Sequence, residues 1–94
     1  MEEKMLTLHP QGKSGVNISK AKYDTIGSAI QDSLRAHQTM TLKELTEEVR
    51  RRLEGSFDGS VSWYVTTVKL DLEARGVIER IPSSTPQRLR LVAG

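Results

Sequence analysis

The strongest constraint on the fold lies in the last third of the chain, where a helical pattern stops at a glycine and two strand patterns follow. Apolar residues at helical spacing run towards Gly76, and glycine often follows the last turn of a helix because it adopts positive φ at little cost. Residues 77–81 and 88–92 then alternate or run apolar, and the connection 82–87 contains two prolines, which exclude regular pairing there. The sequence therefore predicts a helix over about 61–75 with Ser60 as its N-cap, followed by a strand, a loop and a strand.

Two further amphipathic helices are predicted upstream. Apolar residues at spacings of three and four mark a helix over 20–36, with Ser19 as its N-cap. Thr41 and Glu44 fit a capping box at the start of a second helix over 42–53. Each helix has one apolar face, so we expect the three helices to pack around a small shared core.

An N-terminal arm is expected over residues 1–18, ahead of a domain spanning 19–94. Two short apolar stretches flank a segment rich in turn formers, a pattern that fits either a loose hairpin or an arm lying over the domain. We favour an ordered arm because its apolar content is high for a free tail. The apolar residues concerned are Leu6, Leu8, Val16 and Ile18.

The predicted order is arm, helix, a short bridge at Met40, helix, turn, helix, strand, loop and strand. This order resembles the winged helix-turn-helix superfamily over roughly residues 20–92, through TLKEL, VTTVKLDLEARGVIERI and RLRLV. The resemblance implies an α+β fold of three helices and a C-terminal two-stranded wing, preceded here by a β-like arm. The whole chain also resembles a family of small single-domain bacterial proteins without an assigned function, which implies the same fold and no activity.

Catalysis, metals and cofactors are not expected, because no convergent set of reactive groups is recognisable. The chain has no cysteine, and His9 and His37 lack the spacing of metal ligands. Residues 12–14 read Gly-Lys-Ser, but the earlier glycine of a phosphate-binding loop is replaced by Thr7. No apolar run approaches the roughly 18 residues of a membrane span. We therefore expect a cytoplasmic protein that is not an enzyme and has no membrane contact.

Double-stranded DNA is the first partner to consider, and the net charge of +2 permits it without requiring it. Thr66 and Thr67 are expected on the outward side of the third helix, and Ser62 and Lys69 between that side and the core face. The hydroxyl side chains are predicted to contact bases or phosphates, and the lysine to contact a phosphate. Three wing arginines are expected on one face, where they could follow phosphates, although we favour a solvated face on which Glu79 balances their charge. The predicted DNA-binding residues are Ser62, Thr66, Thr67 and Lys69 on the helix and Arg80, Arg88 and Arg90 on the wing.

Other charged residues carry less information. Three consecutive arginines end the second helix, where they extend a basic patch or simply match the helix dipole. The acidic residues of the third helix are expected on its surface. The residues concerned are Arg50, Arg51 and Arg52 on the second helix and Asp71 and Glu73 on the third.

The outward face of the third helix also carries an apolar ridge, formed by Trp63 and Leu70 two turns apart. Three interpretations stay open: the arm covers the ridge, the ridge binds a second copy or another protein, or Trp63 approaches a nucleic acid. Two functions follow as hypotheses. The first is a DNA-binding module or small transcriptional regulator. The alternative is a protein–protein interaction or dimerisation module that uses Trp63 and Leu70 and binds no nucleic acid.

Overall fold

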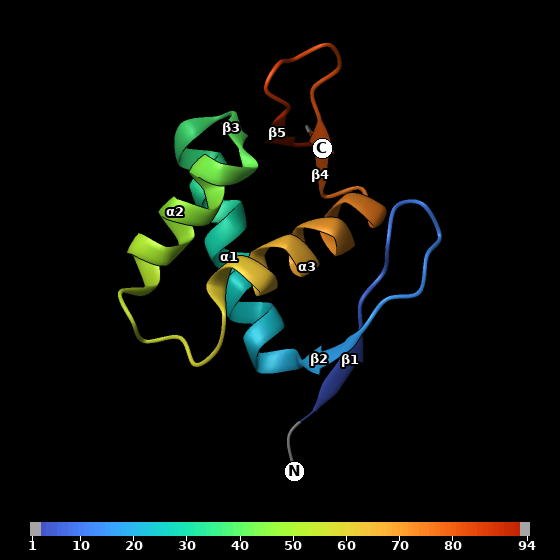
Figure 1. Ribbon diagram of the computed structural model, residues 1–94, viewed down its shortest axis with the longest axis vertical. Helices are drawn as coiled ribbons and strands as arrows, with labels where there is room; N and C mark the ends of the chain where they lie inside the picture. The colour runs from blue at the N-terminus through green and yellow to red at the C-terminus, as the bar shows by residue number, and fades with distance from the viewer. Residues whose placement is uncertain (1–2, 93–94) are drawn as a thin grey trace.

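The computed structural model describes residues 3–92, which form three helices and two small antiparallel sheets (Figure 1). The fold is α+β, as predicted. The elements in chain order are β1 (Lys4–Leu6), β2 (Asn17–Ser19), α1 (Lys20–His37), β3 (Met40–Thr41), α2 (Leu42–Leu53), α3 (Val61–Ala74), β4 (Ile78–Arg80) and β5 (Arg88–Leu91).

All three helices begin at the predicted capping residues. The Ser19 hydroxyl accepts from the backbone N–H of Lys22, and the Ser60 hydroxyl accepts from that of Trp63. At the start of α2, Thr41 and Glu44 form the complete capping box, with each side chain bonded to the other residue's backbone N–H. The helix starts are therefore confirmed, and the predicted ends of α1 and α3 differ from the observed ends by one residue.

Gly76 ends α3 as the sequence predicts. Its φ is +76°, and its N–H donates to the Glu73 carbonyl oxygen at 3.1 Å. The N–H of Val77 donates to the Leu72 carbonyl oxygen at 2.9 Å. These two bonds form a Schellman motif, which turns the chain directly from the helix towards β4.

One apolar core lies between the three helices and one face of the second sheet. Fully or nearly fully buried side chains come from every helix and from all three strands of that sheet. Burial of this kind contributes roughly 1.5–3 kcal/mol for each large apolar side chain. The core is centred on Ile26, Ile30 and Leu34 of α1, Leu45 and Val49 of α2, Val65, Val68 and Leu72 of α3, and Met40, Ile78 and Leu89 of the sheet.

The second sheet has the strand order β3-β5-β4, and all of its pairs are antiparallel. Leu89 of β5 lies opposite Met40 on one side and Arg80 on the other. The predicted bridge at Met40 is confirmed, with the side chain turned into the core. β4 is shorter than the predicted 77–81, although Ile81 N–H still donates to the Arg88 carbonyl oxygen at 2.8 Å.

The arm is an antiparallel hairpin of β1 and β2, with a long loop that lies beside the C-terminal half of α3 (Figure 1). The arm is therefore ordered, but not by the four apolar residues expected to hold it. Only Ile18 of the four is buried, whereas Leu6, Leu8 and Val16 expose 57%, 44% and 40% of their surface.

Backbone contact at Gly15 holds the two sides of the arm loop together. The Thr7 N–H donates to the Val16 carbonyl oxygen at 2.9 Å, and the buried Thr7 hydroxyl accepts from the Val16 N–H at 3.0 Å. A Cβ at Gly15 would lie only 1.7 Å from the Thr7 carbonyl oxygen. Only glycine fits this crossing, because the obstructing atom belongs to the backbone.

We expect Gly15→Ala to destabilise the protein by about 1–3 kcal/mol, because the new methyl group forces the two sides of the loop apart. Chemical denaturation measures the loss, with Ser14→Ala as the neighbouring exposed control. The fluorescence of Trp63, the one tryptophan of the chain, reports displacement of the arm in the native state. A Gly15→Ala protein with wild-type stability and an unchanged spectrum would show that the loop crossing is looser than described.

Candidate interaction surfaces around the third helix

Helix α3 is more deeply buried than its sequence indicates. Val65, Val68 and Leu72 face the core as predicted. Asp71 was expected on the surface, but its exposed fraction is 0%. That expectation is wrong, because the arm and Tyr23 of α1 cover the side of α3 on which Asp71 lies.

Asp71 is the hub that connects the arm, α1 and the end of α3. One oxygen, Oδ1, accepts from the backbone N–H of Leu8 at 2.8 Å. The other, Oδ2, accepts from the Tyr23 hydroxyl and from Arg75 Nε at 2.8 Å. An isolated buried carboxylate is strongly unfavourable, so these three donors are what allow Asp71 to stay inside.

The environment of Asp71 also changes the titration of its tyrosine partner. Burial, followed by the hydrogen bond to the Asp71 carboxylate, raises the pKa of the Tyr23 phenol from 10.0 to about 12. The phenol therefore keeps its proton, and its hydrogen bond to Asp71, well above the pH at which an unfolded tyrosine ionises.

A second ion cluster joins α3 to β4. Lys69 Nζ lies 3.0 Å from Glu73 Oε2, and Arg80 Nε donates to Glu73 Oε1 at 2.6 Å. The Lys69 and Glu73 side chains are only 8% and 6% exposed. Two predictions are wrong here: Glu73 does not lie on the surface, and Lys69 is turned inward to neutralise it instead of pointing out to meet a phosphate.

The arm and α3 enclose a shallow groove of about 160 Å³. Trp63, Thr67 and Leu70 form its helix side, so Thr67 belongs to this groove and not to an open DNA-reading face. Trp63 remains 47% exposed, with its ring edge-on to Tyr64 at 4.9 Å between centroids. The arm side of the groove consists of Thr7, Leu8, His9, Ser14, Gly15 and Val16. The lining contains no Asp, Glu, Lys or Arg.

A polar flank of α3 is left uncovered between this groove and α2. Ser62 and Thr66 are exposed there, one turn apart. Arg50 of α2 donates to the Ser62 hydroxyl at 2.9 Å, which places a guanidinium at the N-terminal end of the flank. Arg80 lies at the other end, over Glu73.

The three arginines predicted to share one face, Arg80 of β4 and Arg88 and Arg90 of β5, do not share it. Arg88 and Arg90 alternate with buried Leu89 and point to the outer face of the sheet. The register places Arg80 opposite Leu89, and directly opposite residues of an antiparallel pair lie on the same face. Arg80 therefore points towards α3. The prediction placed Arg80 near the other two because antiparallel pairing alone does not specify the register.

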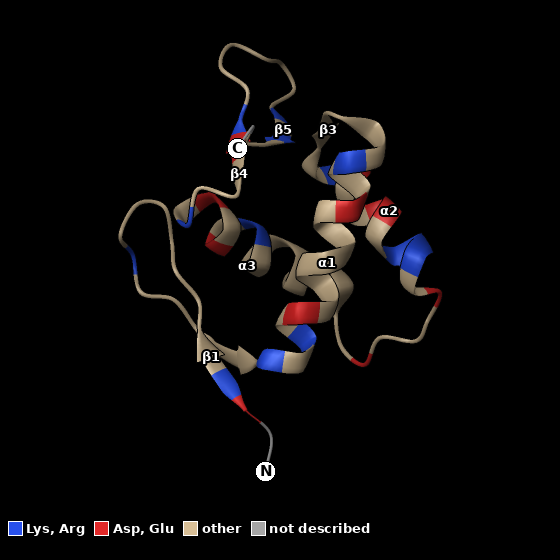
Figure 2. Ribbon diagram, turned by 180° about the vertical axis from the view of Figure 1, so that it is seen from behind, with Lys and Arg blue, Asp and Glu red and all other residues tan. Residues whose placement is uncertain are grey.

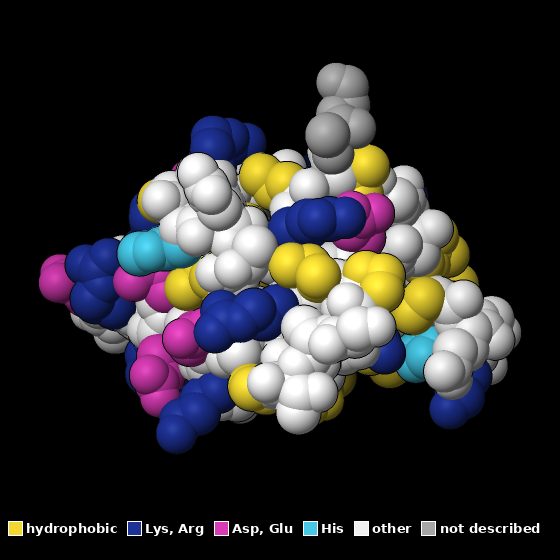
Figure 3. All heavy atoms as spheres, turned by 90° about the horizontal axis from the view of Figure 1, so that it is seen from above, with side chains coloured by type: hydrophobic (Ala, Val, Ile, Leu, Met, Phe, Trp, Pro, Cys, Tyr) yellow, Lys and Arg dark blue, Asp and Glu magenta, His cyan; other side chains and the backbone are white. Residues whose placement is uncertain are grey.

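Both outer-face arginines are paired with carboxylates. Arg90 Nε lies 2.6 Å from Glu79 Oε2, and Arg88 Nη1 lies 3.5 Å from Glu44 Oε1. Basic and acidic segments are also interspersed along α1 and α2 (Figure 2), and the wing end shows side chains of both signs next to one another (Figure 3). These pairs fit the alternative of a balanced, solvated sheet face.

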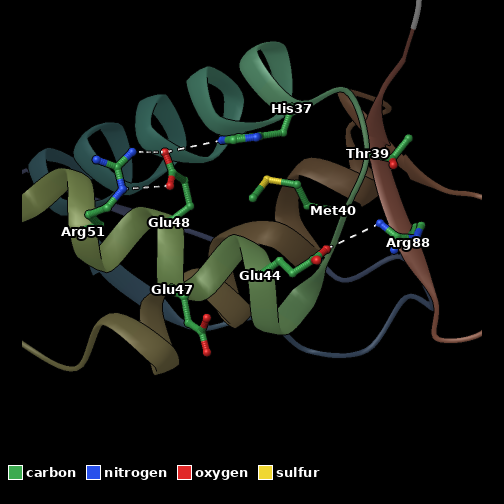
Figure 4. A pocket seen from close by; sticks show the side chains of 8 residues that line it. All are labelled: His37, Thr39, Met40, Glu44, Glu47, Glu48, Arg51 and Arg88. Atoms are coloured by element: carbon green, nitrogen blue, oxygen red, sulfur yellow. Dashed lines mark hydrogen bonds and ion pairs between the residues drawn. The ribbon is translucent and has the colours of Figure 1, made fainter.

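A polar hollow of about 440 Å³ lies between the end of α1, α2 and β5 (Figure 4). Glu48 is its central group and contacts Arg51 and Arg52 at 2.6 and 2.9 Å, with His37 Nε2 at 3.7 Å. The hydrogen bond from Arg51 is the main reason that the pKa of Glu48 falls to about 2. Glu48 therefore stays ionised near neutral pH and is unsuited to exchange protons with a substrate.

Within the described part of the chain, neither histidine belongs to a metal-binding cluster. His9 Nδ1 accepts from the Gln11 N–H at 3.1 Å, and His37 faces Glu48 in the polar hollow. Among residues 3–92, no group of three or more His, Asp or Glu side chains is placed to hold a metal ion. No helix in the same range is long and apolar enough to cross a membrane.

Comparison with known proteins identifies the family and no activity. The chain belongs to the family of unknown function DUF6958, whose model matches residues 4–89. This agrees with the expected likeness to a family without an assigned function. No curated protein and no solved structure matches the chain.

Sequence reasoning missed the residues that fasten the arm, namely Asp71, Thr7 and Gly15. A partial signal was present for the buried ions. Asp71–Arg75 and Lys69–Glu73 are both separated by four residues, the spacing at which side chains on a helix meet. The burial of these pairs was not readable, because it comes from segments that lie far away in the sequence.

We expect the raised pKa of Tyr23 to appear as an alkaline loss of stability. A phenol that holds its proton more tightly in the folded state contributes fully below pH 10, and this contribution disappears as the pH rises from 10 to about 12. Tyr23→Phe should be less stable near neutral pH, because Asp71 loses a donor, but it should lose less stability over that alkaline range. Denaturant unfolding at about pH 8 and about pH 11 measures both effects. Tyr64→Phe is the matched control and should retain the alkaline loss. An equal alkaline loss in the wild type and Tyr23→Phe would contradict the assignment.

Proposed function

We propose that the chain is a winged helix-turn-helix module that binds double-stranded DNA, as a small transcriptional regulator does. The main support for this proposal is the polar flank of α3, which is exposed and has an arginine at each end. The arm lies along the other side of the helix, beside Trp63 and Leu70. The element order from α1 to β5 and the strand order β3-β5-β4 support the fold part of the proposal. β4 and β5 with the loop between them then correspond to the wing.

The dimensions of the flank suit contacts along a nucleic-acid backbone. Ser62 and Glu73 are eleven residues apart, which corresponds to about 16 Å along the helix axis. Arg50 marks one end of this strip and Arg80 marks the other. Arginines at the ends would hold phosphates, while the hydroxyl groups of Ser62 and Thr66 lie between them for base edges or further phosphates.

The ion cluster under Arg80 favours an anion. Lys69 already neutralises Glu73, so the cluster of Lys69, Glu73 and Arg80 carries one net positive charge. The Arg80 side chain is 43% exposed, and Lys69 remains beside the buried Glu73 to neutralise it when the guanidinium turns to another anion. A phosphate can therefore attract the guanidinium without a large loss of stability.

The proposed DNA interface contains fewer residues than the sequence predicts. Thr67 faces the groove and Lys69 is buried, so the proposal rests on Arg50, Ser62, Thr66 and Arg80. Arg88 and Arg90 lie on the outer face of the sheet and take part only if the duplex also contacts that face.

We expect DNA affinity to fall steeply with salt, by about 0.9 log unit per log unit of salt for each phosphate neutralised. Arg50→Ala and Arg80→Ala should each reduce the slope by about 0.9, because each removes one phosphate contact. Fluorescence anisotropy of a labelled duplex at several salt concentrations measures the slope. Arg35→Ala is the matched control, since Arg35 is also exposed and ion-paired but belongs to α1.

The wing arginines provide an internal comparison. If Arg88→Ala and Arg90→Ala reduce the slope and the two flank variants do not, DNA lies on the outer face of the sheet and the proposed flank is wrong. If the wild-type protein does not bind a duplex even at low salt, the DNA-binding function itself is wrong.

A further inference from the structure

The arm loop, residues 8–14, lies against the outward side of α3 and limits how closely the helix can approach a duplex (Figure 1). The major groove of DNA is about 12 Å wide and is filled by one α-helix, whose diameter with side chains is about 10–12 Å. The loop borders Thr67 and Leu70 in one hollow and Ala74 in the next. With the loop in place, α3 is therefore too broad to enter the groove along this side.

Few contacts hold this loop against the helix. Among the described residues, one hydrogen bond joins residues 7–16 to α3, from the Leu8 N–H to Asp71 Oδ1 at 2.8 Å. No residue between 8 and 14 is buried, and all of them except His9 are exposed. Hollows of about 160 and 470 Å³ lie between the loop and the helix. A segment with so little buried surface opens locally at a small cost in free energy while the rest of the fold stays intact.

Asp71 remains compensated when the loop leaves it. Its other oxygen, Oδ2, keeps the hydrogen bonds from the Tyr23 hydroxyl and from Arg75 Nε. Arg75 places a positive charge 2.8 Å from this oxygen. Water can then donate to Oδ1 in place of the Leu8 N–H, so that no unpaired charge is left inside. Opening of the loop therefore exchanges one hydrogen bond and leaves the connection between α1 and α3 intact.

The base of the loop has the contacts that the loop itself lacks. β1 and β2 pair over three positions, and Thr7 and Ile18 are each only 3% exposed. The Thr7 N–H and the Thr7 hydroxyl are both bonded to the backbone of Val16. These contacts close the two ends of the loop without involving α3. Residues 8–14 are therefore able to move as one segment on a fixed base.

We propose that residues 8–14 form a strap that lies over the DNA-reading side of α3 and opens when a duplex binds. The inference rests on the proposed function and adds a step to it. The polar flank with Ser62 and Thr66 makes the first contacts while the strap is closed. Opening then admits α3 to the major groove and frees Thr67, a predicted DNA contact that faces the groove beside the arm in the closed state.

A closed strap lowers the apparent affinity for DNA, because only the open fraction of the protein receives the duplex in full. Leu8→Pro removes the N–H that joins the strap to Asp71, and it should strengthen duplex binding by about threefold to tenfold. Leu8 lies beyond β1, so the proline removes no bond of the β1–β2 ladder. The dependence of affinity on salt should not change, since the number of phosphate contacts is the same.

Gln11→Pro is the matched control, because the N–H that it removes is bonded to His9 within the loop and not to α3. This variant should bind the duplex as the wild type does. Fluorescence anisotropy of a labelled duplex at fixed salt measures all three affinities. Circular dichroism and thermal unfolding confirm that the variants are folded.

Amide hydrogen exchange of the wild-type protein follows the strap without any variant. In the free protein, the Leu8 amide should exchange at least about tenfold faster than the Thr7 amide, which is bonded within the base. Saturation with a duplex should remove the remaining protection of Leu8 and leave that of Thr7 unchanged. If Leu8→Pro does not fold, this measurement alone decides the outcome.

The outcomes separate the strap from the function on which it rests. Equal affinity of the wild type and Leu8→Pro, or stronger protection of the Leu8 amide in the complex, would show that the arm stays in place and would overturn the strap alone. Failure of both the wild type and Leu8→Pro to bind a duplex at low salt would overturn the strap together with the DNA-binding function.

Discussion

The placement of the arm, and with it the surface of the whole domain, depends on one buried carboxylate. Asp71 accepts from the backbone of Leu8, from the hydroxyl of Tyr23 and from the guanidinium of Arg75. An unpaired charge at this position would cost several kcal/mol, so the three donors and the carboxylate stabilise one another as a set. The arm contributes few buried apolar side chains of its own, and this polar connection fixes its position on α3.

Fixing the arm divides the exposed surface of α3 into two parts with different chemistry. On one side, Trp63, Thr67 and Leu70 face an uncharged groove. On the other, Ser62 and Thr66 lie between arginines from α2 and β4. A helix with one open outward face would force nucleic acid and protein to compete for the same residues. Here the arm separates an apolar surface from a polar one on a single short helix.

The local features of the fold were predictable from the sequence because they depend on neighbouring residues. Ser19, Thr41 and Ser60 start the three helices through bonds that span three residues, and Gly76 ends α3 through bonds of similar span. Hydrophobic periodicity placed the core faces for the same reason. The candidate site was less predictable: the exposure of Thr66 and Trp63 followed from periodicity, whereas the direction of the charged residues did not.

The failures share a physical cause, which is that burial and strand register depend on distant partners. Asp71 is inside because of Leu8, which lies 63 positions away in the chain. Arg80 faces α3 because β4 pairs with β5 in a particular register, and a slip of one residue would reverse its direction.

The strand order β3-β5-β4 has a consequence for how the domain is completed as the chain is made. The central strand of the sheet comes last among its three strands, so neither β3 nor β4 has a strand to pair with until Arg88–Leu91 arrives between them. A ribosome-bound chain with α1, α2 and α3 already outside the exit tunnel would still lack every pair of this sheet. The core residues Met40 and Ile78 would then be partly uncovered, and closure of the sheet over them would follow translation of the central strand instead of accompanying the helices.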